Sequence, residues 1–327
     1  LVVSIISMTV ILELTGAFCL MPTFLKDFGL GRSLWLSIFH SVSAFNNAGF
    51  GLFPDSLVQY ADFAWPMAVI SVLIIMGGIG YQVIMEGFMW VRARLQRRKT
   101  HSVFSLHFKV VTSTTLALLL LGTIAFFLIE YDNPATLAGK GFGLKMLLAG
   151  FQSVVMRTAG FNSIDIGAME TSSLFVAIAL MFVGASPGST GGGIKTTTAR
   201  ILIVSTKAAL RGKEEVNCYQ RQIPMTRVLK ALAVVVASAI SVITITICVS
   251  VSDPSLEFIA ILFETVSAFA TVGLSTGITA DLSVWGQLFI ISIMYIGRVG
   301  ILLLMSALLG DPSPSAIHFP EEDLLTG

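Results

Sequence analysis

The segment SAFNNAGF at residues 43–50 returns twice along the chain, as VVMRTAGF at 154–161 and as SAFATVGL at 267–274. The glycine of each copy recurs after 111 and then 113 residues. A period this long indicates a whole membrane unit rather than a solenoid repeat. Each copy is a short polar strand between long apolar runs, and irregular backbone at membrane depth persists only beside a water-filled path or inside protein. The copies therefore predict a pore walled by backbone carbonyls.

The composition indicates a membrane protein. Of 327 residues, 55% are hydrophobic and only 12% are charged, whereas soluble domains carry about 25% charged residues. The net charge of +1 gives no sign of nucleic-acid binding. The three cysteines show no pair spacing, and no cluster of His, Cys and carboxylates has metal-ligand spacing. No Ser, His and Asp arrangement supports nucleophilic catalysis. We therefore expect neither an enzyme nor a fixed structural metal.

Six apolar runs are long enough to cross a bilayer, and three amphipathic runs are too short to do so. We expect the short runs to be re-entrant pore helices that end at the glycine strands. The unit is then a span, a pore helix, a filter strand and a second span. The predicted fold is an all-α membrane protein of potassium-channel-like, pseudo-fourfold units, three of them present. The long runs are 1–22, 64–91, 106–130, 172–202, 227–251 and 284–309, and the short runs are 33–45, 143–157 and 255–270.

Basic residues set the predicted orientation and the domain boundaries. Two basic linkers connect the units, and the positive-inside rule places them in the cytoplasm. The chain begins without methionine inside an apolar run, so we expect a preceding unit of roughly one hundred residues. The predicted units are 1–91, 106–205 and 227–309, the linkers are 92–105 and 206–226, and a cytoplasmic tail covers 310–327.

The glycine strands are candidate ligands for a dehydrated K⁺, because an ion sheds water only where oxygens replace it at similar geometry. Glycine suits such a wall, since it reaches positive φ and adds no side chain. A lone glycine in an apolar protein serves close helix packing more often, but its recurrence after three re-entrant helices favours a filter. The candidate filter residues are Asn46, Asn47, Ala48, Gly49, Thr158, Ala159, Gly160, Thr271, Val272 and Gly273.

A second polar stretch, at 185–195, interrupts the run 172–202. Glycine and proline at this density cannot remain helical, so we expect two half-helices around a loop. A phosphate-binding loop needs lysine directly after its last glycine, but Ile194 intervenes. The better interpretation is a flexible plug beneath the filter. Its residues are Ser186, Pro187, Gly188, Ser189, Thr190, Gly191, Gly192, Gly193 and Lys195.

Arg298 lies in mid-span, where a charge is costly and marks a functional candidate. It occupies the position in its unit that matches the polar loop of the preceding unit, so we expect it to face the same pore. There it could form an electrostatic barrier to cations or donate to carbonyls of the loop. A buried structural pair with Glu264 is the alternative. The matching stretch of the first unit, 77–80, is rich in glycine and is expected to leave room for the plug.

Together these motifs closely resemble the membrane subunit of the Trk/Ktr/HKT superfamily of potassium transporters, specifically the bacterial Ktr type. Segments 43–50, 157–162 and 270–275 carry the resemblance, which covers the whole chain as the second to fourth of four repeats. It implies a single-file K⁺ path and makes the polar loop an intramembrane gate. In some relatives a serine replaces the first-repeat glycine and Na⁺ passes more readily. The K⁺ over Na⁺ preference therefore depends on a repeat outside this sequence.

The resemblance also implies partners. It predicts a homodimer, with residues 319–327 in the dimer contact, and a soluble regulatory ring that docks on the cytoplasmic linkers. ATP or ADP would bind that ring, so we expect no cofactor in this chain, whose transported ion is K⁺. The expected location is the lipid bilayer of the plasma membrane.

Two other functional classes remain open at this point. A secondary transporter for sodium or another monovalent cation would bind its substrate at broken helices and alternate access. A purely structural subunit of a larger pump would conduct no ions even when it is reconstituted with its regulator. The repeated strand favours the filter over both. Both passive and sodium-coupled uptake remain open.

Overall fold

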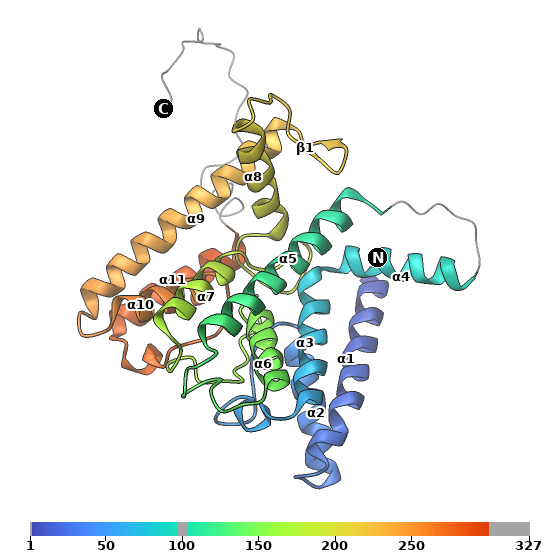
Figure 1. Cartoon of the computed structure of the whole chain (residues 1–327), viewed down its shortest axis with the longest axis vertical. Helices are drawn as coiled ribbons and strands as arrows, with labels where there is room; N and C mark the ends of the chain where they lie inside the picture. Colours follow the sequence, from blue (N-terminus) through green and yellow to red (C-terminus); the bar gives the residue numbers. More distant parts are fainter. Residues whose placement is uncertain (1, 97–103, 301–327) are drawn as a thin grey trace.

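The computed structural model describes residues 2–96 and 104–300, whose regular structure is helical apart from one short pair of strands (Figure 1). The predicted all-helical architecture is present in this part of the chain. Its elements are α1 (Val2–Phe24), α2 (Leu30–Phe45), η1 (Val58–Tyr60), α3 (Ala64–Ile79), α4 (Tyr81–Leu95), α5 (Leu106–Ile129), α6 (Phe142–Val155), α7 (Thr171–Phe182), α8 (Thr196–Ala209), β1 (Asn217–Cys218), β2 (Arg221–Gln222), α9 (Met225–Ser252), α10 (Phe258–Phe269), η2 (Ile278–Asp281) and α11 (Val284–Val299).

The helices follow one order three times along the chain. A long helix (α1, α5 or α9) is followed by a short one (α2, α6 or α10) that packs against it, and then by further short helices. The short helices α2, α6 and α10 coincide with the predicted runs 33–45, 143–157 and 255–270. Each has a largely buried second half, so these three helices form the inner part of the molecule while the long helices lie outside.

The long helices have the character of membrane spans. Among the described residues, α1, α5 and α9 are each long and apolar enough to cross a bilayer, and α3 with α4 would pass as a fourth, bent span. Their outward faces are apolar: on α9, for example, Ile240, Ile243 and Ile247 are all more than half exposed. An apolar exterior of this extent is stable in lipid and not in water.

The predicted span 64–91 is not one straight helix, because the helix breaks at Gly80. There α3 and α4 meet at an angle of 106°, and Gly80 has a φ of 93°, a left-handed value that suits glycine. The break has a tertiary cause. The Tyr81 N–H donates to the carbonyl of Gly188 in the distant polar loop at 3.2 Å, which diverts the chain from its helical hydrogen bonds.

The predicted span 172–202 is interrupted by the loop 183–195 between α7 and α8, as the glycine density indicated. The last predicted span, 284–309, is described as far as residue 300, and α11 ends at Val299. The rest of that span, residues 97–103 of the first basic linker and the predicted tail 310–327 lie outside the described residues.

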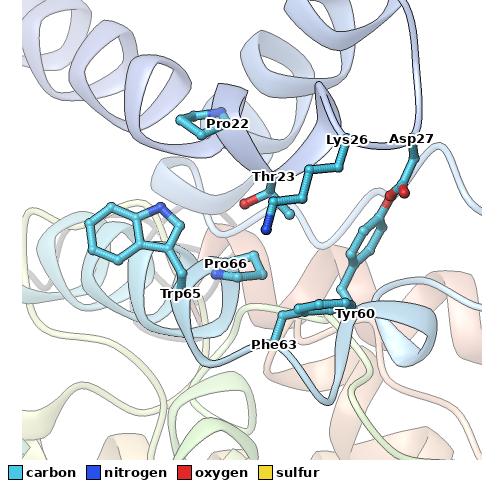
Figure 2. A pocket seen from close by; sticks show the side chains of 8 residues that line it. All are labelled: Pro22, Thr23, Lys26, Asp27, Tyr60, Phe63, Trp65 and Pro66. Carbon is cyan, nitrogen blue, oxygen red and sulfur yellow. The ribbon is translucent and has the colours of Figure 1, made fainter.

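An aromatic pocket of about 160 Å³ lies between the end of α1 and the start of α3, at the end of the molecule opposite β1 (Figures 1 and 2). The Trp65 indole N–H donates to the Cys19 carbonyl at 2.8 Å. The Tyr60 hydroxyl donates to Asp27 at 3.2 Å. Burial, with the hydrogen bond and the charge of Asp27, raises the pKa of Tyr60 to about 12. Tyrosine and tryptophan here agree with an aromatic belt at a membrane interface.

Candidate functional site

After each of the helices α2, α6 and α10 the chain enters a strand in which the sign of φ alternates in the same way. The residue two before the glycine and the glycine itself both have positive φ, and the residue between them does not. Side-chain-bearing residues adopt such values rarely, so three matched pairs indicate a structural requirement. The values are 51° at Asn47 and 74° at Gly49, 73° at Thr158 and 78° at Gly160, and 53° at Thr271 and 86° at Gly273.

The three strands converge on one another. A Cβ at Gly49 would lie 2.6 Å from the carbonyl oxygen of Ala159, and a Cβ at Gly160 would collide with the carbonyl oxygen of Val272. A Cβ at Gly273 would lie 4.0 Å from the Gly160 Cα. Main-chain oxygens of predicted filter residues therefore line the narrow space between strands from three distant parts of the chain. Any larger residue at Gly49 or Gly160 would fill that space.

Hydroxyl groups brace the first and third strands from behind. The Ser43 Oγ donates to the Phe50 carbonyl at 2.8 Å, and the Ser267 Oγ donates to the Leu274 carbonyl at 2.6 Å. The second copy has Val154 at this position and cannot form the bond. Its strand is instead held from outside: the Asn162 carbonyl accepts from the Leu57 N–H at 3.0 Å, and the Asn162 N–H donates to the Ser56 Oγ at 3.1 Å.

Two neighbouring strands are also joined at their inner ends. The Asn47 side chain lies 3.2 Å from the Thr158 Oγ1. With the amide turned so that its nitrogen donates to the carbonyls of Ala44 and Ile74, its oxygen accepts from Thr158. Asn46, by contrast, ends α2 and points away from the strands, donating to Glu13 of α1 at 2.7 Å. The side chain of Asn46, a predicted filter residue, therefore lies outside the junction.

The polar loop lies directly beneath the three strands. A Cβ at Gly191 would collide with the Thr158 hydroxyl, and a Cβ at Gly192 would collide with that of Thr271. The Thr190 hydroxyl donates to the carbonyl of Phe45, at the end of α2, at 3.4 Å. The loop thus reaches the inner end of all three strands, and its glycines allow this close approach.

Main-chain bonds fix the loop to the glycine-rich end of α3. The Ser186 N–H donates to the Gly78 carbonyl at 3.0 Å, and the Thr190 N–H donates to the Gly77 carbonyl at 3.3 Å. A Cβ at Gly80 would lie 2.7 Å from the Pro187 carbonyl oxygen. Within the stretch 77–80, Gly80 therefore leaves room for the loop, whereas Gly77 and Gly78 leave room for Phe45 and Asn47 at the end of α2.

Contacts within the loop fold it back on itself. The Thr196 hydroxyl donates to the buried Ser186 hydroxyl at 2.9 Å, the Ser189 hydroxyl donates to the Ser186 carbonyl, and Lys195 donates to the Gly191 carbonyl at 2.8 Å. Gly188 is exposed, and Gly193 turns with a φ of 69°. The loop is therefore a compact structure with a defined shape.

Arg298 reaches the loop from α11. Its Nη1 donates to the Thr190 carbonyl at 2.7 Å. The alternative partner, Glu264, instead accepts from the Thr279 hydroxyl. Arg298 and Lys195 both line a cavity of about 330 Å³ between the loop, α9 and α11. Two positive groups therefore flank the space below the loop, and one of them anchors it.

Arg157 and Glu13 are residues in the site that the sequence interpretation did not place there. Arg157 is buried, and its guanidinium lies 3.5 Å from the carbonyl of Gly184, where the loop leaves α7. Glu13 accepts from Asn46 at the end of α2. Both carry the signal that marked Arg298, an ionisable residue at membrane depth. The signal points to both positions, although at Glu13 a proton or sodium site competes with a helix-end or packing role.

The geometry can now be set beside known proteins. A family model described as "TrkH: Cation transport protein" matches residues 1–315. The chain belongs to this cation transport protein family. It is 38% identical over its full length to Ktr system potassium uptake protein B of Vibrio alginolyticus, of which it covers 70%. It is equally 38% identical to the potassium/sodium uptake protein NtpJ of Enterococcus hirae, covering 100% of this chain and 72% of that protein.

A solved structure shows the fold of this family. The crystal structure of the potassium transporter TrkH from Vibrio parahaemolyticus aligns with a TM-score of 0.72 at 16% identity. The alignment covers 92% of this chain, which spans 62% of the TrkH chain. The resemblance seen in the sequence motifs is therefore confirmed at the level of the family. The protein is a multi-pass membrane transporter of the TrkH family and is not an enzyme.

Proposed function

We propose that this TrkH-family protein takes up potassium through a single-file filter of main-chain carbonyls. One observation carries the proposal: three glycine strands, far apart in the sequence, converge with carbonyl oxygens in the space between them. Oxygens so arranged are suited to replace the hydration shell of a monovalent cation. The relatives named for potassium and potassium/sodium uptake support K⁺ or Na⁺ as the ion.

The three repeated helix groups are three pseudo-equivalent units of a pseudo-fourfold pore. The units cover 1–91, 106–205 and 227–309, with cytoplasmic linkers at 92–105 and 206–226. The equivalent φ values of the strands support the repeat, since unrelated loops have no reason to share them. The basic residues of the linkers support a cytoplasmic position in the plasma membrane.

The loop 185–195 is the gate of this pathway. Its glycines lie against the hydroxyls at the inner ends of the strands, where an ion leaving the filter would pass. α8 follows it directly, so a partner that moves α8 can withdraw the loop. We expect that partner to be a soluble regulatory ring that binds ATP or ADP, as in a Ktr system, and the membrane subunit to be a homodimer.

Uptake of radioactive Rb⁺ tests the function. The full protein, expressed with a Ktr regulatory subunit in a potassium-starved host lacking its own uptake systems, is expected to restore uptake. Uptake should be competed by K⁺ more strongly than by Na⁺. Uptake no higher than in the empty host would refute the proposal and leave the structural-subunit alternative.

A further inference from the structure

A cavity remote from the filter lies at the end of the molecule where α5, α8 and α9 meet. It has a volume of about 370 Å³ and is closed on one side by the β1–β2 hairpin. Figure 1 shows this region beside β1, opposite the end that carries the aromatic pocket. The second basic linker forms part of it, so the positive-inside rule places the cavity on the cytoplasmic side.

The cavity holds positive charge without a visible counter-charge. Arg200 enters it from α8, Arg227 from the first turn of α9, and His107 from the first turn of α5. No carboxylate is among the described residues that line it. The Arg200 Nε is buried and has no hydrogen-bond partner within the described structure, although its guanidinium faces the Tyr219 ring at 6.0 Å. A desolvated donor of this kind is stabilised by an anion.

Apart from Thr197 and Gln222, the rest of the lining is apolar. Leu106 and Val110 contribute from α5, Ile201 from α8, and Ile223 from the segment before α9. A free phosphate would satisfy the arginines and leave this wall in contact with water. A phospholipid satisfies both parts, since its phosphate meets the arginines while an acyl chain covers the wall.

The depth of the cavity also fits a lipid. His107 and Arg227 each stand in the first turn of a helix long enough to span the membrane. Groups at the ends of spans lie at the level of the headgroups, where anionic lipids gather on the cytoplasmic side. We propose that this cavity binds the phosphate of an anionic phospholipid of the cytoplasmic leaflet, with an acyl chain against the apolar wall.

The bound lipid would join three helices. Its phosphate would bridge Arg200 and Arg227, and α8 begins with Thr196, directly after the polar loop. A lipid in the cavity therefore restrains α8 relative to α5 and α9. The binding site itself does not depend on the transported ion, so its test is independent of any flux measurement.

Native mass spectrometry of the purified full protein tests the site. The protein is titrated in detergent with phosphatidylglycerol and, separately, with phosphatidylcholine. We expect retention of phosphatidylglycerol over phosphatidylcholine, and about 25-fold weaker phosphatidylglycerol binding after Arg200→Gln with Arg227→Gln, since each arginine near the surface contributes about fivefold. Equal retention of the two lipids by the unaltered protein would by itself overturn the proposal.

Two variants serve as controls. Lys207→Gln with Lys213→Gln removes the same charge from the same end of the molecule but outside the cavity, and should leave the lipid affinity within twofold. Arg200→Lys with Arg227→Lys keeps the charge and should retain most of the binding, which separates a lost ligand from a lost fold. An equal loss in the two glutamine variants would show non-specific attraction and would overturn the site.

Two further experiments test other occupants of the cavity. Inorganic phosphate at millimolar concentration should not displace phosphatidylglycerol, and displacement would assign the site to free phosphate instead. The regulatory subunit is the other competitor. A glutamine variant that keeps phosphatidylglycerol but no longer binds that subunit would make the cavity a protein-docking surface and refute the lipid assignment.

Discussion

Gly160 is a residue of the candidate filter with no room for a side chain. A Cβ there would collide with the Val272 carbonyl and would lie 3.1 Å from the Gly49 Cα, and its φ of 78° disfavours other residues. The strain falls on the strands themselves, because both neighbours are main-chain atoms. Selectivity, which depends on the spacing of these oxygens, should therefore respond before folding does.

We expect Gly160→Ser to reduce discrimination against Na⁺ by about tenfold or more, as a side chain displaces the carbonyl wall. The measurement compares how strongly K⁺ and Na⁺ each inhibit Rb⁺ uptake. Gly143→Ser on α6 is the matched control, because a Cβ at Gly143 meets no atom within 4 Å. If the selectivity of Gly160→Ser is unchanged, Gly160 is not part of the filter.

At this scale the sequence pattern located the three glycine strands but did not reveal the partners of their side chains. The repeat located Gly49, Gly160 and Gly273, because a positive-φ requirement leaves glycine visible in the sequence. It could not reveal that Asn46 turns to Glu13, or that Arg157 reaches Gly184. Those contacts join residues from different elements, and no local pattern encodes them.

The polar loop and α11 are coupled elements, since Arg298 donates to the Thr190 carbonyl at 2.7 Å. A hydrogen bond from a charged group contributes about 1.5–3 kcal/mol. Arg298→Gln should therefore loosen the loop and raise Rb⁺ flux without the regulatory subunit by about tenfold or more. Lys140→Gln, which removes a positive charge from an outer ion pair with Asp62, should leave this flux unchanged.

Arg298→Lys separates the two roles considered for Arg298. Lysine keeps the charge but lacks the planar group that reaches Thr190. If Arg298 anchors the loop, the lysine variant should leak like the glutamine variant. If the charge acts as a barrier to cations, the lysine variant should remain closed, and the anchoring role would be refuted.

The start of α11 depends on Asp253, which follows the last residue of α9. Asp253 accepts from the Ser283 N–H at 2.7 Å, the Ser283 hydroxyl at 3.0 Å and the Ser252 hydroxyl at 2.6 Å. Burial acts to raise the pKa of Asp253, but these hydrogen bonds outweigh it and hold the pKa below its usual range. The charged form is therefore favoured by folding.

A depressed pKa in the folded state gives a stabilisation that is present above the unfolded pKa of about 3.9 and is lost as the pH falls through the folded pKa. We expect Asp253→Ala to lower the thermal unfolding temperature in detergent at pH 7, with a cost of about 1–3 kcal/mol from the unpaired Ser283 groups. The difference from the unaltered protein should shrink as the pH falls below about 4. A difference independent of pH would contradict the charged hydrogen bonds.

The elements themselves were largely predictable from apolar runs and their lengths. The exception is the break at Gly80, where the stretch 77–80 has too little polarity to distinguish a kink from close helix packing. The break depends on the Tyr81 N–H bonding to Gly188, more than a hundred residues away in the loop. A helix whose end is set by a tertiary partner cannot be delimited from its own residues.

The whole molecule is predicted to place its two ends on opposite sides of the membrane. Asp55 is exposed in the segment between α2 and α3, and Lys213 is exposed in the segment between α8 and β1. Figure 1 shows these two segments near opposite ends of the molecule. With Cys19, Cys218 and Cys248 replaced, Asp55→Cys should react with a membrane-impermeant maleimide added to intact cells. Lys213→Cys should react only after the cells are opened. The reverse pattern would invert the orientation and place the basic linkers outside.

The second strand differs from its two counterparts in one respect with consequences for the whole molecule. Where Ser43 and Ser267 provide an internal brace, Val154 provides none, and Asn162 is held by Ser56 and Leu57 of the outer segment. In the proposed ion path, the second strand is thus held by the segment between α2 and α3. A toxin, antibody or cross-link that shifts residues 53–58 would therefore displace this strand and alter the proposed pore without entering it.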